Sequence, residues 1–184
     1  MKLEKNIQLI AKEVLKQESE TLLNLTKYID DSFSACVETI LQSPGRLVVT
    51  GVGKSAIIGQ KIVATLNSTG TPALFMHAAD AIHGDLGMIR NDDIVMAVSR
   101  SGNTSEIKVL IPLLKRTEVK LIAMVSEKDS YLGKHADFIL HAYAPQEADP
   151  LGLAPTTSTT AALALGDALA ICLLEVRGFT QQDF

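Results

Sequence analysis

Residues 94–107, Ile-Val-Met-Ala-Val-Ser-Arg-Ser-Gly-Asn-Thr-Ser-Glu-Ile, decide the fold class of this chain. The stretch begins with an apolar run, passes through a glycine turn rich in hydroxyl groups, and then takes on helical spacing. A short uninterrupted apolar run is typical of a strand that is buried on both faces, as in a parallel sheet. The stretch therefore predicts a strand at 94–99, a turn, and a helix at 104–117.

The same strand–turn–helix pattern recurs on both sides of this stretch. Further apolar runs lie at 46–50, 73–76, 121–125 and 138–141, and further helical patterns lie at 55–68, 130–136 and 157–176. Such alternation with short links predicts an α/β fold, namely a three-layer αβα sandwich around a five-stranded parallel sheet. Because these sheets bind ligands beyond the carboxyl ends of their strands, the residues that follow each strand are the candidate site.

A long amphipathic helix is predicted ahead of the first strand. Apolar residues recur at helical spacing at Leu3, Ile7, Ile10, Val14, Leu22, Leu25 and Ile29. Two interpretations stay open: a helix packed on the core, or an arm that also buries its apolar stripe against another subunit. We expect one domain over 1–184, with a helical arm over 1–43 and an α/β core over 44–178.

Composition limits the class of protein. The net charge of −4 disfavours nucleic-acid binding, which needs a basic face to neutralise phosphates. The most apolar late stretch, 161–174, is shorter than a bilayer span, so we expect no membrane binding. Cys36 and Cys172 form no pairing motif and are expected to be buried thiols of a cytoplasmic protein.

A glycine turn, Gly51-Val52-Gly53-Lys54-Ser55, follows the first predicted strand. A nucleotide-binding phosphate loop would need glycine where Val48 stands, and a dinucleotide fingerprint would need an acid where His77 stands. What remains is an anion or sugar-hydroxyl site at a helix N-terminus, formed by Gly53, Lys54 and Ser55. An ordinary helix start with an exposed lysine is the alternative.

The turn after the third strand is predicted to hold a phosphate monoester. It gathers hydroxyl, amide and glycine residues at a helix start: Ser99, Ser101, Gly102, Asn103 and Thr104. Backbone N–H groups, hydroxyl groups and the helix dipole all favour a phosphate there. A capping box with Asn103 as N-cap and Glu106 at the third position accounts for only those two residues.

Histidines and acids follow the second strand, at His77, Asp80, His83 and Asp85. Their spacing fits no zinc pattern, so no metal is required, and His77 is only a weak candidate for an adventitious metal. A catalytic or substrate-binding histidine is favoured instead.

A proline-rich loop with Glu147 follows the fifth strand, and a run of hydroxyl residues at 156–160, including Thr156, Thr157 and Ser158, begins the last helix. No helical or strand duty is evident for Glu147 in this loop. We expect the hydroxyl residues to line the same polar cleft.

These segments together resemble the SIS family of phosphosugar-binding proteins, which have a flavodoxin-like fold, and more closely its arabinose 5-phosphate isomerases. The resemblance rests on Gly-Val-Gly-Lys-Ser (51–55), Ser-Thr-Gly-Thr-Pro (68–72), Ile-His-Gly-Asp-Leu-Gly-Met (82–88), Ser-Arg-Ser-Gly-Asn-Thr-Ser-Glu-Ile (99–107), Pro-Leu-Gly-Leu-Ala-Pro-Thr-Thr-Ser-Thr-Thr (150–160), Gly-Asp-Ala-Leu-Ala (166–170) and Arg-Gly-Phe-Thr (177–180). It covers nearly the whole chain.

The resemblance implies an isomerase of D-ribulose 5-phosphate and D-arabinose 5-phosphate, at the entry to the sugar Kdo of lipopolysaccharide or capsule. It implies a homotetramer with shared active sites and no cofactor. Catalytic roles fall on Lys54, Glu106, Glu147 and the sugar-contacting His83, and substrate contacts on Gly70, Thr71 and Tyr143.

Two departures from the family pattern accompany the match. The family reads His-Pro-Gly-Glu where this sequence has His-Ala-Ala-Asp at 77–80. The family also continues past Gly-Phe-Thr into Ser-His-Pro-Gly-Gly, whose histidine is implicated in catalysis, and most members then add a pair of CBS domains. This sequence ends at Phe184, so we expect the SIS domain alone, and the activity of these 184 residues stays an open question.

Aldose–ketose isomerisation needs a base that moves a proton between C1 and C2, and donors that stabilise an enediolate. We assign the base to Glu147, with a pKa raised by partial burial, and the enediolate partner to Lys54. Glu106 and His83 orient hydroxyl groups or relay protons. A non-catalytic phosphosugar sensor and an isomerase of another phosphosugar remain the alternatives.

Overall fold

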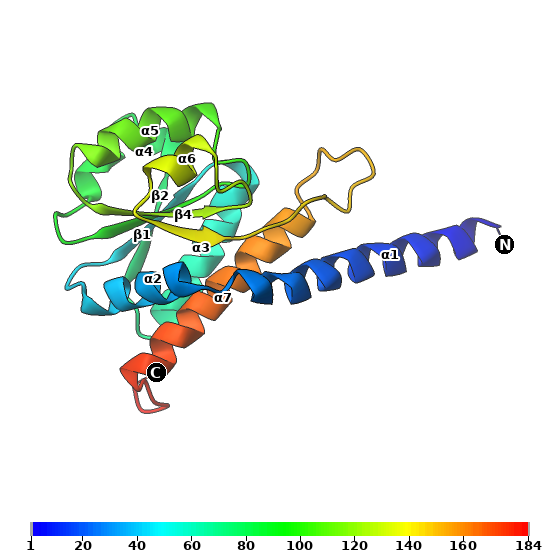
Figure 1. The fold of residues 1–184 in the computed structure, drawn as a ribbon, viewed down its shortest axis with the longest axis horizontal. Helices are drawn as coiled ribbons and strands as arrows, with labels where there is room; N and C mark the ends of the chain where they lie inside the picture. Colours follow the sequence, from blue (N-terminus) through cyan, green and yellow to red (C-terminus); the bar gives the residue numbers. More distant parts are fainter. Residues whose placement is uncertain (1, 184) are drawn as a thin grey trace.

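A five-stranded parallel sheet forms the middle of the molecule, in the strand order β2-β1-β3-β4-β5 (Figure 1). The computed structural model describes the backbone of residues 2–183 and the side chains from Asn6 to Asp183, so Leu3 of the predicted stripe and both chain ends lie outside the described part. The strands are β1 (Leu47–Gly51), β2 (Ala73–His77), β3 (Ile94–Val98), β4 (Lys120–Val125) and β5 (Phe138–His141). All five confirm the predicted runs to within one residue at either end. The strand order reverses between β1 and β3, which makes their carboxyl ends the expected ligand position.

Helices cover both faces of this sheet, which confirms the three-layer αβα sandwich (Figure 1). They are α1 (Lys2–Leu25), η1 (Thr26–Tyr28), α2 (Asp31–Gln42), α3 (Gly53–Ser68), α4 (Ala78–Ala81), η2 (Asp85–Met88), α5 (Ser105–Lys115), α6 (Tyr131–His135) and α7 (Thr157–Arg177). Side chains alternate along each strand, so Val49 belongs to the core cluster that the sheet forms with α2, α3 and α7, whereas Val48 belongs to the cluster formed with α4, α5 and α6. The sequence did not predict α4 and η2, because a single turn is too short to show a helical period.

Helix α1 leaves the body of the molecule as an arm (Figure 1). Its C-terminal end is anchored, because Leu25 is buried against Ala144 and Ala161. Large apolar side chains farther along are more than half exposed, at Ile7, Leu9, Ile10, Leu15 and Leu23. Within the described residues, the arm therefore carries apolar surface that this chain alone does not cover.

Helix α7 lies on the same face of the sheet as α2 and α3, where it forms part of the core. At 21 residues it is longer than the apolar stretch 161–174, and by length and composition alone it could cross a membrane. Its apolar side chains are used inside the protein, where Leu165, Leu169 and Leu173 are buried in the same core cluster. Gly166 has no Cβ to obstruct Ile62, whose side chain approaches to 2.5 Å from where a Cβ would stand. Core packing therefore accounts for the buried apolar residues of α7, whereas Ile171 and Val176 on the same helix are exposed.

A buried ion pair closes the amino-terminal edge of the sheet, where β1 and β3 begin. Asp93 is fully buried and accepts hydrogen bonds from Arg46 Nε at 3.1 Å and Arg46 Nη2 at 2.7 Å. The backbone N–H groups of Arg46 and Arg90 donate to the same carboxylate at 2.9 Å each. This clasp therefore fixes the entry into β1 and the entry into β3 together.

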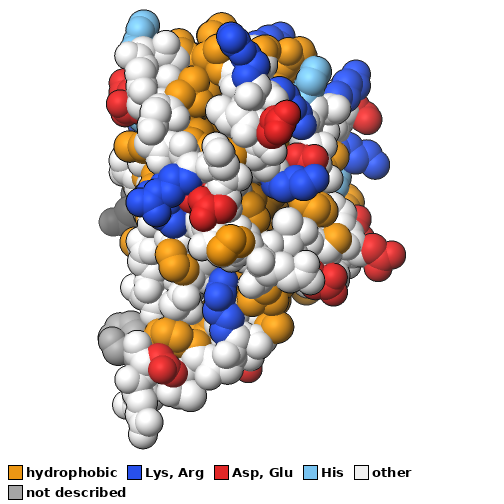
Figure 2. Space-filling model, turned by 90° about the vertical axis from the view of Figure 1, so that its left-hand side faces the viewer, with side chains coloured by type: hydrophobic (Ala, Val, Ile, Leu, Met, Phe, Trp, Pro, Cys, Tyr) orange, Lys and Arg blue, Asp and Glu red, His pale blue; other side chains and the backbone are white. Residues whose placement is uncertain are grey.

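The surface carries charges of both signs, and the two cysteines differ in burial. On the face drawn in Figure 2, basic and acidic side chains are interspersed with apolar ones rather than gathered by sign. Cys36 is buried, and burial raises the pKa of its thiol to about 12, whereas Cys172 is only half-buried. The expectation of two buried thiols is thus confirmed for Cys36 alone.

Candidate active site

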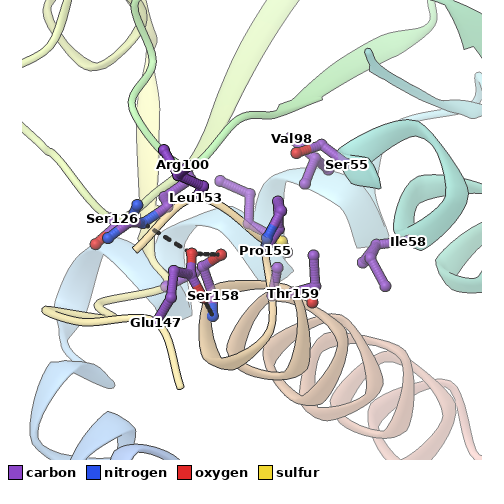
Figure 3. A pocket seen from close by; sticks show the side chains of 13 residues that line it. Ser55, Ile58, Val98, Arg100, Ser126, Glu147, Leu153, Pro155, Ser158 and Thr159 are labelled. Carbon is purple, nitrogen blue, oxygen red and sulfur yellow. Dashed lines mark hydrogen bonds and ion pairs between the residues drawn. The ribbon is translucent and has the colours of Figure 1, made fainter. Parts of the chain in front are cut away.

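A cavity opens at the carboxyl edge of the sheet, beside the point where the strand order reverses (Figure 3). Its apolar wall includes Val98 of β3 and Ile58 of α3. Its polar lining comes from the start of α3, the loops after β3, β4 and β5, and the start of α7: Ser55, Arg100, Ser126, Glu147, Ser158 and Thr159. The structure thus brings Ser55, Glu147 and Ser158, which were predicted from separate segments, into one cavity.

Glu147 is the buried acid of this cavity, with only 8% of the residue exposed. Its Oε2 atom accepts hydrogen bonds from the backbone N–H of Thr156 at 2.9 Å and of Ser158 at 3.1 Å, and from the Thr156 hydroxyl at 3.3 Å. Its Oε1 atom accepts a short hydrogen bond from the Ser158 hydroxyl. Glu147 therefore caps the N-terminus of α7, which corrects the expectation that it has no helical duty.

Arg100 faces the other side of the Glu147 carboxylate, with its Nε atom 3.3 Å from Oε1 (Figure 3). Burial alone would raise the pKa of Glu147, but the hydrogen bonds from Ser158 and Thr156 and the charge of Arg100 outweigh it, and the pKa lies below its usual value. The expectation of a raised pKa is therefore wrong for the site without substrate. Capping donors and a neighbouring cation stabilise the charged form.

The predicted phosphate loop is held in one conformation by its own side chains. Ser99 Oγ accepts from the Gly102 N–H at 3.1 Å, and Ser101 Oγ accepts from the Asn103 N–H at 3.3 Å. Gly102 has a φ of +61°, and a Cβ there would collide with Ser130 Oγ, so only glycine fits. The loop is thus pinned against the start of α6 while it leads into the N-terminus of α5.

The capping box predicted for this loop is wrong. The N-cap of α5 is Thr104, and the Asn103 side chain instead accepts from the Tyr131 N–H at 3.0 Å and donates to the Ser101 carbonyl at 3.0 Å. Glu106 lies in the first helical turn, where its Oε2 accepts from the Ser105 hydroxyl at 2.9 Å. Its own backbone N–H and Ser105 lower the pKa of Glu106, so it is a carboxylate at neutral pH.

Lys54 and Glu106 lie in the first turns of α3 and α5, and His83 lies in the segment after β2, but none of the three lines the cavity. Lys54 is exposed at the start of α3, after Gly53, whose φ of +56° makes the turn. His83 is exposed between α4 and η2. The described residues hold no group of three side chains arranged for a metal ion, and His77 lies 3.9 Å from Asp80 alone.

Gly70 and Thr71, which were predicted to contact the substrate, lie far from the cavity. They precede β2, whose amino-terminal end pairs with the start of β1, so they lie at the opposite edge of the sheet from the cavity. Gly70 has a φ of +80° and would clash with the Phe179 ring if it carried a Cβ. The Thr71 N–H donates to the Leu66 carbonyl at 2.9 Å. Within this chain both residues shape the turn from α3 into β2.

Two other predicted contacts are placed for packing. Tyr143 packs at a tilted angle against the rings of Tyr28 and His141, with centroid distances of 5.3 Å and 5.4 Å, outside the cavity lining. Thr157 is buried at the start of α7. Neither side chain reaches the cavity in this structure.

Two polar residues of the cavity were given no role from the sequence, Arg100 and Ser126, whereas Thr159 belongs to the run of hydroxyl residues at 156–160 that was expected to line it. Ser126 follows β4 directly, so applying the rule of inspecting the residue after each strand to the fourth strand would have found it. Arg100 lies inside the loop after β3 that was predicted to bind phosphate, but that prediction assigned the phosphate to the neighbouring hydroxyl residues. The ion pair between Arg100 and Glu147 joins residues 47 positions apart, and no local pattern predicts it.

The fold and the cavity define a class of doubly wound α/β proteins that bind a small ligand at the switch point. The chain belongs to the SIS domain family, whose model matches residues 40–172. It is 55% identical to an arabinose 5-phosphate isomerase of Yersinia pestis over 97% of this chain and 55% of that protein, and 50% identical to an arabinose 5-phosphate isomerase of Pseudomonas aeruginosa over 100% and 57%.

A solved structure agrees with this placement. An Escherichia coli CFT073 protein in complex with arabinose 5-phosphate superposes with a TM-score of 0.93 at 37% identity, over 97% of this chain and 95% of that one. The chain spans little more than half the length of the curated relatives it matches, but nearly all of this solved chain.

Proposed function

We propose that this chain is an aldose–ketose isomerase that interconverts D-ribulose 5-phosphate and D-arabinose 5-phosphate through an enediolate. The observation that carries the proposal is the 55% identity to the Yersinia pestis arabinose 5-phosphate isomerase over 97% of the chain. The superposition on a protein in complex with arabinose 5-phosphate supports the same substrate class.

The cavity offers the groups that this reaction uses. Glu147 is a buried carboxylate with one oxygen turned to the cavity side, and we assign it the proton transfer between C1 and C2. The loop at 101–104 and the N-terminus of α5 receive the phosphate, where backbone N–H groups and the helix dipole favour an anion. Lys54 stabilises the enediolate oxygen, and Glu106 and His83 bind hydroxyl groups, once substrate draws these loops inward. No step of this scheme calls for a metal or a redox cofactor.

The proposal includes an assembly and a cellular role. The exposed apolar side chains of the α1 arm, together with Leu151 and Leu153 at the tip of the loop before α7, support a homotetramer in which neighbouring subunits complete each site. We place the enzyme in the cytoplasm, where arabinose 5-phosphate feeds the synthesis of Kdo for lipopolysaccharide or capsule.

The decisive experiment is an assay of the 184-residue chain with ribulose 5-phosphate in the presence of EDTA, with unphosphorylated ribulose as the control substrate. Formation of arabinose 5-phosphate from the phosphorylated sugar alone is the expected result. Saturable binding of arabinose 5-phosphate without turnover would instead indicate a phosphosugar sensor. Absence of both turnover and binding would point to another substrate.

A further inference from the structure

The Glu147 carboxylate is over-supplied with donors for a group that must accept a proton. A carboxylate presents about four lone-pair positions. Oε2 is approached by three donors from Thr156 and Ser158, and Oε1 is approached by the Ser158 hydroxyl and by Arg100. The four donors of Thr156 and Ser158 make hydrogen bonds, whereas Arg100 adds a positive charge beside Oε1. As long as this cation stays there, it stabilises the charged form of Glu147 and weakens Glu147 as an acceptor of a proton from a substrate carbon.

The four hydrogen-bond donors are fixed by the fold, and the Arg100 cation is the fifth group beside the carboxylate. The four donors belong to the first turn of α7, and three of them come from the buried Ser158 or from backbone N–H groups that would otherwise lack a partner. Arg100 differs because it reaches across from the loop after β3 and 42% of its side chain is exposed. Its backbone stays anchored, since the Arg100 carbonyl accepts from the Ser126 N–H at 3.0 Å. Only the Arg100 side chain is free to move.

We propose that Arg100 is an anion-operated latch on Glu147, which holds the carboxylate in the empty site and swings to the phosphate group of an entering phosphosugar. The latch rests on the proposed function for the identity of the incoming anion. Arg100 is then a positioning residue for Glu147 and a contact for the substrate. Its departure leaves one oxygen of Glu147 open toward the cavity, as proton transfer requires.

The chemistry of Arg100 suits this exchange. A guanidinium group presents a planar fork that binds phosphate in two-pronged geometry. Its contact with Glu147, Nε to Oε1 at 3.3 Å, is an ion pair rather than a two-pronged hydrogen-bonded contact. A phosphate dianion is therefore a better partner for Arg100 than the single contact that it would give up. Arg100 also directly precedes the loop at 101–104 to which the phosphate is assigned, so the swing need not carry it far.

The other described groups that face Glu147 are uncharged, so the proposed influence of Arg100 on the pKa of Glu147 is specific to Arg100. The start of α7 contributes only hydroxyl and backbone N–H donors, and α1 contributes the neutral Gln17, whose Nε2 donates to the Glu147 carbonyl at 2.9 Å. The loop after β4 contributes the Ser126 hydroxyl to the cavity. Among the described residues, the charged partner of the Glu147 carboxylate is Arg100. Removing or occupying Arg100 should therefore raise the pKa of Glu147.

Inorganic phosphate tests the latch without any need for turnover. The carboxyl carbon of Glu147 is followed by NMR against pH, with and without phosphate, in the wild-type chain and in R100A, and E147Q assigns the signal. R116A is the matched control, because Arg116 is exposed at the far end of α5. We expect phosphate to raise the Glu147 pKa in the wild type and in R116A. In R100A the pKa should already be raised, and phosphate affinity should fall at least about tenfold.

Kinetics separate the latch from a purely structural role. R100A should raise the KM for ribulose 5-phosphate about tenfold and move the acid limb of kcat/KM to higher pH, and Arg100→Lys should restore part of both. The latch would be overturned if R100A bound phosphate as tightly as the wild type does. It would also be overturned if neither R100A nor phosphate changed the pKa of Glu147. A wild-type chain without turnover would refute the proposed function but would leave the NMR result to decide the latch.

Discussion

At the scale of single residues, Glu147 combines two duties that use different oxygen atoms. Oε2 accepts from the backbone N–H groups of Thr156 and Ser158 and caps α7, whereas Oε1 faces Ser158, Arg100 and the cavity. The cap fixes the direction of the carboxylate with backbone donors that cannot rotate away. Burial alone would raise the pKa of Glu147, but the Ser158 hydroxyl and these backbone donors lower it, so the carboxylate that we propose as the base is charged and oriented.

Glu147→Gln should therefore reduce both turnover and stability. Loss of a positioned base costs about 10²- to 10⁴-fold in kcat, and the weaker cap costs about 1 kcal/mol in the free energy of unfolding. Glu175→Gln is the matched control, because Glu175 is exposed at the opposite end of α7 and does not line the cavity. Initial rates with ribulose 5-phosphate and urea unfolding measure both effects. Near-normal turnover of the glutamine variant would remove Glu147 from the role of base.

At the scale of elements, the sequence predicts what burial dictates and misses what distant partners supply. The strands were located to within a residue because each is a short apolar run between breakers. The α5 cap was misassigned because the Asn103 side chain bonds to Tyr131, which is 28 residues away. Glu147 was given no helical duty because its cap acts across the 9 residues to Thr156. Sequence patterns describe local hydrogen bonds, and these two contacts are not local.

The clasp between the entries of β1 and β3 makes a second prediction. Asp93→Asn should lower the free energy of unfolding by about 3 kcal/mol, because Arg46 would lose a fully buried partner. Burial alone would raise the pKa of Asp93, but the hydrogen bonds from Arg46 and the Arg90 N–H lower it overall. The clasp is therefore complete at neutral pH and is lost as pH falls through the folded pKa, below the usual value near 4. The difference between wild type and variant should shrink there.

Urea unfolding at a series of pH values measures this difference. Asp92→Asn is the control, because Asp92 is the exposed neighbour of Asp93 and should change stability by no more than about 0.5 kcal/mol. Equal stabilities for the two variants at neutral pH would show that the clasp adds nothing to the sheet.

At the scale of the whole molecule, the topology separates the candidate site from the framework. The cavity lies at the carboxyl edge of the sheet and the clasp at its amino-terminal edge. The arm extends away from the body of the molecule (Figure 1). Gly70 and Thr71 show why the sequence could not assign edges in advance. Both residues precede β2 and therefore lie at the amino-terminal edge of the sheet. The segment 68–72, from which the family resemblance predicted their substrate contacts, contains no signal for that position. The arm is not remote from the cavity, since Gln17 of α1 holds the Glu147 backbone.

The arm carries the last prediction, that self-association depends on its apolar face. Ile7 and Ile10 lie about one turn apart and are 59% and 53% exposed, so Ile7→Lys with Ile10→Lys should weaken assembly at least about 100-fold. Lysine is a good helix former, so the circular dichroism signal of α1 should stay unchanged. Glu20→Lys adds a lysine elsewhere on the exposed surface of α1 and should leave assembly intact. Sedimentation velocity distinguishes multiples of the 19.7 kDa chain, and turnover measured on the same samples tests whether neighbouring subunits complete each site. A wild-type chain that stays monomeric at every concentration would refute the assembly, and an assembled double variant would move the interface away from the arm.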